Sequence, residues 1–192
     1  FEKQLSKRKI PSFNFVTMDA DRNIGYFYNG RIPYRKDAPV ARQIIKSSSS
    51  KDIWDDANLV SDLPKYINPS NGWLQSTNQN PFHVMGNYSL EKKLIRKFVD
   101  FEKRLTNRSY VANELLSSNE SIDLNRFIEI KFDNTYSKNS RQYKYLKSIA
   151  QYDQNIQQTI KNWNRKTDFR NTNAGLGMCF MAQEWIAEMN SK

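Results

Sequence analysis

The pattern of the sequence changes near residue 88, and this change constrains the fold more than any single motif. Every proline except Pro11 lies between residues 30 and 87, a stretch with little helical or strand periodicity. From Ser89 onward, apolar residues recur at the three- to four-residue spacing of helices. The sequence therefore predicts a long, packed loop region followed by a helical second half, within one partial domain over residues 1–192.

The segment before the loop region, Ser12 to Asn29, has the pattern of a β-hairpin. Two runs rich in aromatic and β-branched residues, SFNFVTM and NIGYFYN, are separated by the polar stretch DADRN. Asp19 and Asp21 in this stretch are candidate calcium ligands, but a calcium loop needs more oxygen donors than the pair supplies. Turn formation is the better interpretation of both residues.

Helices are predicted over several stretches of the second half. Ser89 is placed to cap the first, whose apolar residues from Leu90 to Leu105 share one face. The others are expected over Ser109–Leu116, Asp123–Lys131, Arg141–Trp163 with a break, and Leu176–Met189. Cys179 lies in the apolar run GLGMCFMA, which predicts a buried, small hydrophobic side chain. Together with the hairpin, these helices indicate an α+β fold.

The charge favours one alternative function. The chain has 30 Lys and Arg against 20 Asp and Glu, a formal net charge of +10, which raises the prior for a polyanionic partner. With the 10 tyrosines, this charge suggests a basic RNA- or DNA-binding module. However, the positive charges are scattered as on a solvated surface, and no RNP-like, glycine-rich or zinc motif occurs. We therefore expect no specific nucleic-acid partner.

The sequence predicts no metal, no cofactor and no membrane span. His83 is the single histidine and has no carboxylate at ligand spacing, so we interpret it as a surface or packing residue. No apolar stretch approaches the length needed to cross a bilayer. The start FEKQLSKRKIPSF has neither an initiator Met nor an apolar signal region, which is typical of a fragment or a processed chain.

Two blocks in the first half carry a resemblance to a known family. The first is MDADRNIGYFYNGRIPYR, Met18 to Arg35, and the second is DLPKYINPSNGWLQSTNQNPF, Asp62 to Phe82. Their order and spacing resemble the β chain of the penicillin acylase family, whose members are N-terminal-nucleophile hydrolases. The second half agrees more loosely, through NRSYVANELL and the stretch WNRKTD. Within the family the chain looks most similar to acylases acting on fatty-acyl amides, such as acyl-homoserine lactones and lipopeptides.

The resemblance implies an αββα sandwich formed by self-cleavage of a precursor. Cleavage in this family exposes a serine as the first residue of the β chain, and its own α-amino group acts as the base. This chain begins with Phe1. We therefore expect the nucleophile to lie outside this sequence, on segments of the same precursor that are the expected partners. The chain alone is expected to be inactive.

The resemblance places two site residues in this chain. Asn78, in the element STN, corresponds to the side-chain amide that stabilises the oxyanion in the family, and the first Asn of that element is replaced here by Ser76. Without the resemblance, Asn78 would be interpreted as a turn former. Phe15, just before the turn of the hairpin, corresponds to a wall of the acyl pocket, and an ordinary core aromatic is the alternative.

The resemblance thus predicts an internal segment of an amidase that cleaves acyl amides, acyl-homoserine lactones or β-lactam side chains. Antibiotic metabolism or quorum quenching would be the biological setting, in the periplasm or outside the cell. An acylase-like chain that has lost activity and acts as a binding protein is the remaining alternative. Residues encoded upstream of Phe1 distinguish these two.

Overall fold

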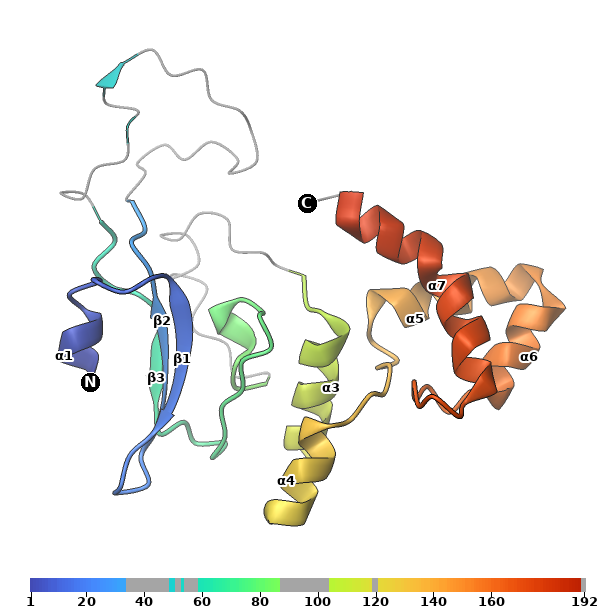
Figure 1. The fold of residues 1–192 in the computed structure, drawn as a ribbon, viewed down its shortest axis with the longest axis horizontal. Coiled ribbons are helices and arrows are strands. Elements are labelled where there is room, and N and C mark those ends of the chain that lie inside the picture. Colours follow the sequence, from blue (N-terminus) through green and yellow to red (C-terminus); the bar gives the residue numbers. More distant parts are fainter. Residues whose placement is uncertain (34–48, 51–52, 54–58, 87–103, 119–120, 191–192) are drawn as a thin grey trace. The chain divides into compact units, whose positions relative to one another are not determined.

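The computed structural model describes residues 1–33, 49–50, 53, 59–86, 104–118 and 121–190 (Figure 1). The chain forms two compact units, Phe1–Arg104 and Leu105–Lys192, and each is described by itself. The described residues form six α-helices and one three-stranded antiparallel sheet, so the predicted α+β class is confirmed. The αββα sandwich and the single partial domain over residues 1–192 stay predictions.

The first unit is built on a small antiparallel sheet. After the short helix α1 (Glu2–Leu5), strands β1 (Phe13–Met18) and β2 (Ile24–Asn29) form the predicted hairpin, and β3 (Lys65–Ile67) pairs with the other edge of β2. Figure 1 shows these three strands side by side. The 3₁₀ helix η3 (Pro81–His83) follows. The sequence predicted the hairpin but not the three-residue strand β3.

The turn of the hairpin is organised by Asp19. Its Oδ1 accepts the backbone N–H of Asp21 at 3.0 Å and that of Asn23 at 2.8 Å. Its Oδ2 accepts the side-chain amide of Asn23, also at 2.8 Å. A short polar side chain that bonds backbone groups two to four residues on is a standard way of closing a turn. The interpretation of Asp19 as a turn residue is therefore confirmed.

The two faces of the sheet contact different parts of the unit. Side chains alternate along a strand, so Phe15 and its cross-strand partner Phe27 point to one face. There the ring of Phe1 packs edge-on, with centroids 5.9 Å from Phe15 and 5.6 Å from Phe27. Tyr26 and its partner Tyr66 point to the opposite face. Because Tyr26 is fully buried, the second face is the buried face of the sheet.

The second unit is helical, as predicted. Its elements are α3 (Asn107–Leu116), α4 (Leu124–Lys131), α5 (Arg141–Ile149), the 3₁₀ helix η4 (Ala150–Tyr152), α6 (Gln154–Asn162) and α7 (Thr172–Asn190). The predicted break falls at Asp153, whose Oδ1 accepts the backbone N–H of Asn155 at 2.7 Å and thereby caps α6. The predicted last helix begins four residues earlier than expected, at Thr172.

Helices α5 and α6 pack against α7 around one hydrophobic core. Leu146 of α5 and Met181 of α7 are fully buried there. Trp163 is also buried and donates its indole N–H to the carbonyl of Lys166 at 2.8 Å. Gly177 lies against the Trp163 ring, and a Cβ at this position would come within 2.8 Å of it. The close approach of α7 to Trp163 therefore depends on a residue without a side chain.

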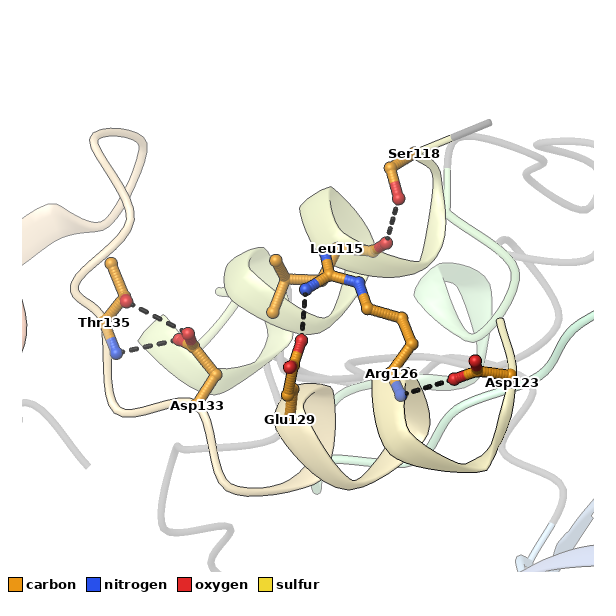
Figure 2. Close-up of polar contacts among 7 residues, drawn as sticks. All are labelled: Leu115, Ser118, Asp123, Arg126, Glu129, Asp133 and Thr135. Carbon is orange, nitrogen blue, oxygen red and sulfur yellow. Dashed lines mark hydrogen bonds and ion pairs between the residues drawn. The ribbon is translucent and has the colours of Figure 1, made fainter. Parts of the chain in front are cut away.

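Local hydrogen bonds mark the start of α4 and the turn that follows this helix (Figure 2). Asp123 Oδ1 accepts the backbone N–H of Arg126 at 2.8 Å and caps α4, while the guanidinium of Arg126 pairs with Glu129 one turn later at 3.0 Å. Beyond the helix, Asp133 Oδ1 accepts the backbone N–H of Thr135 at 2.9 Å. Because the cap at Asp123 lies within a few residues of the first turn, the start of α4 could be predicted from the sequence.

One expectation from the sequence is wrong, and another concerns residues that the structure does not describe. Cys179 was expected to be buried, and this is wrong, because its side chain is exposed. It lies two residues before buried Met181, about 200° around α7, and therefore on the other side of the helix. The helix expected from Ser89 to Leu105 lies almost entirely outside the described residues. In the described part of the chain, no helix combines the length and apolar character needed to cross a bilayer.

Candidate active site

The candidate site is the loop of residues 71–85, called here the amide loop because its polar contacts come from Asn and Gln side chains. The loop packs on the buried face of the sheet. Val84 is 1% exposed and Met85 is buried, and both belong to the hydrophobic cluster formed with Tyr26 and Tyr66. Leu74, on the opposite arm of the loop, contacts the same cluster. Apolar burial thus holds both arms of the amide loop on the sheet.

Side-chain and backbone hydrogen bonds join the two arms. The backbone N–H of Gln75 donates to the Val84 carbonyl at 2.9 Å, and its side-chain amide donates to the His83 carbonyl at 3.0 Å. Nearer the base, the amide of Asn71 donates to the Met85 carbonyl at 3.3 Å. Buried backbone carbonyls require hydrogen-bond donors. Here these donors come from the Gln75 backbone and from side-chain amides, whereas in a regular β-ladder they would come from the neighbouring strand.

The apex of the loop is closed by Gln79. Its buried side-chain oxygen accepts both the backbone N–H of Thr77, at 2.6 Å, and the Thr77 hydroxyl, at 2.8 Å. The amide nitrogen of the same side chain reaches back to the Gln75 carbonyl at 3.4 Å. One glutamine therefore ties together the residues on either side of position 78. The chain between these anchors has little freedom to change its backbone conformation.

Asn78 lies at this apex with its side chain exposed. Its φ of 63° is in the left-handed region, which Asn adopts more readily than most residues. An asparagine side chain carries an NH₂ group with two donors, the chemistry needed to stabilise a developing oxyanion. The structure thus places the Asn78 side chain at the surface of a braced loop, and its role in oxyanion stabilisation stays a prediction.

Asn80 has a different role from Asn78. It is 7% exposed, and its side-chain oxygen accepts the backbone N–H of Phe82 at 3.0 Å, which caps η3. Pro81 follows at the first position of this short helix, where a missing N–H costs nothing. The structure therefore assigns Asn80 to the loop scaffold, as expected for an asparagine beside a proline.

Phe15 lies on the opposite face of the sheet from the amide loop. Its half-buried ring contacts Phe1 and also Phe13, with centroids 6.5 Å apart in the second pair. The amide loop instead packs on the face formed by Tyr26 and Tyr66. Within the described residues, the two site residues predicted from the sequence therefore belong to different surfaces of the same small sheet.

In the part of the chain that the structure describes, neither His83 nor a metal site adds charge to the amide loop. His83 is half-buried at the end of η3, and burial lowers the pKa of its imidazole, which favours the neutral ring. Among the residues that the structure describes, no three His, Cys, Asp or Glu side chains gather as a metal site would need. The amide loop is thus a neutral, amide-rich surface.

Sequence reasoning missed the roles of two residues in this loop. Gln75 and Gln79 stand in the second sequence block, and neither was singled out, yet both brace the apex that carries Asn78. The stretch QSTNQN contains four side-chain amides, and this density could have indicated a loop held by side-chain hydrogen bonds.

A family model described as penicillin amidase matches residues 1–191 of this chain. The match includes the hairpin, the amide loop and the helical unit. It spans the two sequence blocks of the first half and also the second half, where the resemblance is looser.

Proposed function

We propose, on the premise that this chain belongs to the penicillin amidase family, that it is a segment of an amidohydrolase that cleaves an acyl group from an amine. The match of the family model over residues 1–191 is the observation that carries this proposal. The described residues add one element that such chemistry needs, an exposed amide donor on a braced loop.

In the proposed reaction, a serine supplied by another segment of the same precursor attacks the carbonyl carbon of the amide. Its hydroxyl proton passes to its own α-amino group, and the carbonyl oxygen becomes an oxyanion. Collapse of this intermediate expels the amine, which takes up the proton, and water then releases the acyl group. The part of this chain is to stabilise the oxyanion, and we assign that role to the Asn78 side-chain amide.

The geometry of the amide loop supports this role for Asn78. An oxyanion donor must be positioned before the reaction, because a donor that reorganises during the reaction loses much of its effect. The contacts between Gln79 and Thr77 restrict the backbone on both sides of Asn78. Asn80 fixes the following turn. Donor and scaffold are thus separate residues of one loop.

We also propose that Phe15 contributes to the acyl pocket. Its ring is only half-buried and belongs to an aromatic group with Phe1, Phe13 and Phe27. Such a surface suits an apolar acyl chain. The substrates that fit this proposal are fatty-acyl amides, including acyl-homoserine lactones and lipopeptides, handled in the periplasm or outside the cell.

Exposed apolar side chains support the proposal that other segments of the precursor pack on this chain. Val16 and Met18, which share one face of β1, are 49% and 74% exposed. Leu124 and Phe127, three residues apart on α4, are 73% and 52% exposed. Large apolar side chains that share an element and remain exposed commonly mark surfaces covered by a partner. The α chain and the rest of the β chain are the proposed partners.

The proposal is tested by comparing the complete precursor with residues 1–192 alone, using a panel of N-acyl amides and acyl-homoserine lactones. We expect turnover by the precursor, none by residues 1–192, and recovery when the missing segments are co-expressed. Hydrolysis by residues 1–192 alone would contradict the proposed source of the nucleophile. A processed precursor that binds these ligands without cleaving them would favour the inactive binding protein.

A further inference from the structure

A second polar surface lies in the first unit, at the end of β2 away from the hairpin turn. The segment after α1 passes this end, and Val60 donates its backbone N–H to the Ile32 carbonyl at 2.8 Å. Between these segments is an open hollow of about 580 Å³. Its lining includes four cationic side chains: Lys7, Arg8, Lys9 and Arg31.

Arg8 is held firmly at the centre of this surface. Its guanidinium donates to the Gly30 carbonyl at 3.1 Å and to the Ser61 carbonyl at 2.9 Å, which ties three segments of the unit together. Its backbone has a φ of 51°, a left-handed conformation that is uncommon for residues other than Gly and Asn. Backbone conformations of this kind gather at functional sites, where the surrounding structure maintains them.

The positive charge of Arg8 has no anionic partner in the described part of the chain. Both of its hydrogen-bond partners are neutral carbonyls, and burial lowers the pKa of the guanidinium. An arginine carries five N–H donors, so further donors remain beyond the two carbonyl contacts. A half-buried cation that has no counter-ion among the described residues is the arrangement expected where an anion is bound from outside.

A second hollow, which Arg8 also lines, differs in its charge. It is lined by Glu2, Asp62 and Lys65, and Glu2 forms an ion pair with Lys65. Charges of both signs are therefore present there. In the basic hollow, none of the described lining residues is acidic. Among the described residues, the excess of positive charge is thus a local property of this surface.

We propose that the basic hollow binds a phosphoryl group, carried by a soluble phosphate ester or by a lipid headgroup. A phosphate monoester carries close to two negative charges and three strong acceptor oxygens, and it can use donors from several cations at once. A single carboxylate is satisfied by one arginine. The volume of about 580 Å³ lies within the range of small-molecule sites and leaves room for the body of a ligand.

The proposal is tested by calorimetric titration of the processed protein with inorganic phosphate, against sodium chloride at equal ionic strength. The double variant Lys7→Gln/Lys9→Gln removes two exposed cations of the hollow and leaves the structural contacts of Arg8 in place. Lys144→Gln/Lys147→Gln removes the same charge from the exposed side of α5 and is the matched control. We expect saturable binding by the wild type and the control, and binding at least tenfold weaker in the hollow variant.

A second arm distinguishes the two sources of the phosphoryl group. Co-sedimentation is measured with phosphatidylcholine vesicles with and without phosphatidic acid, and glycerol phosphate is titrated in parallel. The site is assigned to a headgroup if the wild type binds the acidic vesicles, the hollow variant does not, and inorganic phosphate competes with the vesicles for binding. Binding of glycerol phosphate without vesicle binding assigns it to a soluble ester. The proposal is overturned if phosphate gives no saturable heat, or if the hollow variant binds phosphate or acidic vesicles as strongly as the control.

Discussion

The side-chain oxygen of Gln79 accepts two hydrogen bonds from Thr77, one from its backbone N–H at 2.6 Å and one from its hydroxyl at 2.8 Å. This pair encloses Asn78 and restrains the apex of the amide loop. The relationship separates two kinds of residue in one short segment. Gln79 restrains the backbone of the loop, and we propose that it positions Asn78, whose amide is proposed to contact the reacting oxygen.

Gln79→Ala is expected to lower kcat of the complete enzyme by roughly tenfold to a hundredfold, because small displacements of a positioned group are costly to catalysis. The melting temperature should also fall, since Thr77 loses the acceptor of both bonds. Gln158→Ala, on the exposed side of α6, is the control. A variant that melts earlier but keeps kcat and KM would show that the brace has no catalytic role.

Asn80→Ala is expected to reduce stability with little effect on turnover. The variant removes the acceptor for the Phe82 N–H at the start of η3, and loss of such a cap costs about 0.5–2 kcal/mol. Asn80→Asp keeps the acceptor and should retain more stability. Thermal unfolding and kcat are measured together. Loss of activity without loss of stability would mean that Asn80, rather than Asn78, is the oxyanion donor.

Gly177→Ala is expected to destabilise the helical unit by about 1–3 kcal/mol, because the new methyl group would overlap the Trp163 ring. Gly175→Ala in the same helix is the matched control. Its Cβ would meet nothing within 4 Å, so the variant should gain roughly 0.5–1 kcal/mol from helix propensity. Chemical denaturation measures both. Equal effects of the two substitutions would contradict the packing of α7 on Trp163.

The turn at Asp19 is expected to weaken in acid. Hydrogen bonds from the side chain and then the backbone of Asn23 lower the pKa of the Asp19 carboxyl. A carboxyl with a lowered folded-state pKa contributes stability above its unfolded-state pKa, and this contribution is lost as pH falls through the folded-state value. The stability difference between wild type and Asp19→Ala should therefore shrink on going from neutral to strongly acidic pH. An unchanged difference would argue against this account of the turn.

Local signals explain which parts of the fold could be predicted from the sequence. The cap at Asp123 and the polar turn after Met18 act within a few residues, so the bounds of α4 and of the hairpin follow from short stretches. Strand β3 could not be predicted, because it has three residues and depends on pairing with β2 some forty residues earlier. The exposure of Cys179 depends on which side of α7 contacts the core.

In the candidate site, too, single positions could be predicted from the sequence, but contacts that depend on the folded backbone could not. The family resemblance could nominate Asn78 and Phe15 as single positions. It could not show that Gln79 braces the apex, since that contact depends on the backbone conformation of the loop. Nor could it place Phe15 on the face of the sheet opposite the amide loop, which follows from the register of β1 against β2.

The central claim is that the Asn78 amide stabilises the oxyanion, and kcat of Asn78→Gly in the complete enzyme tests it most directly. Glycine accepts the left-handed φ of 63°, whereas alanine would add about 1–2 kcal/mol of backbone strain. Asn78→Gly therefore removes the donor with little change in the loop. We predict that kcat falls by roughly 10²–10³, with a much smaller change in KM and an unchanged melting temperature. A near-normal kcat in this variant would contradict the assignment of Asn78.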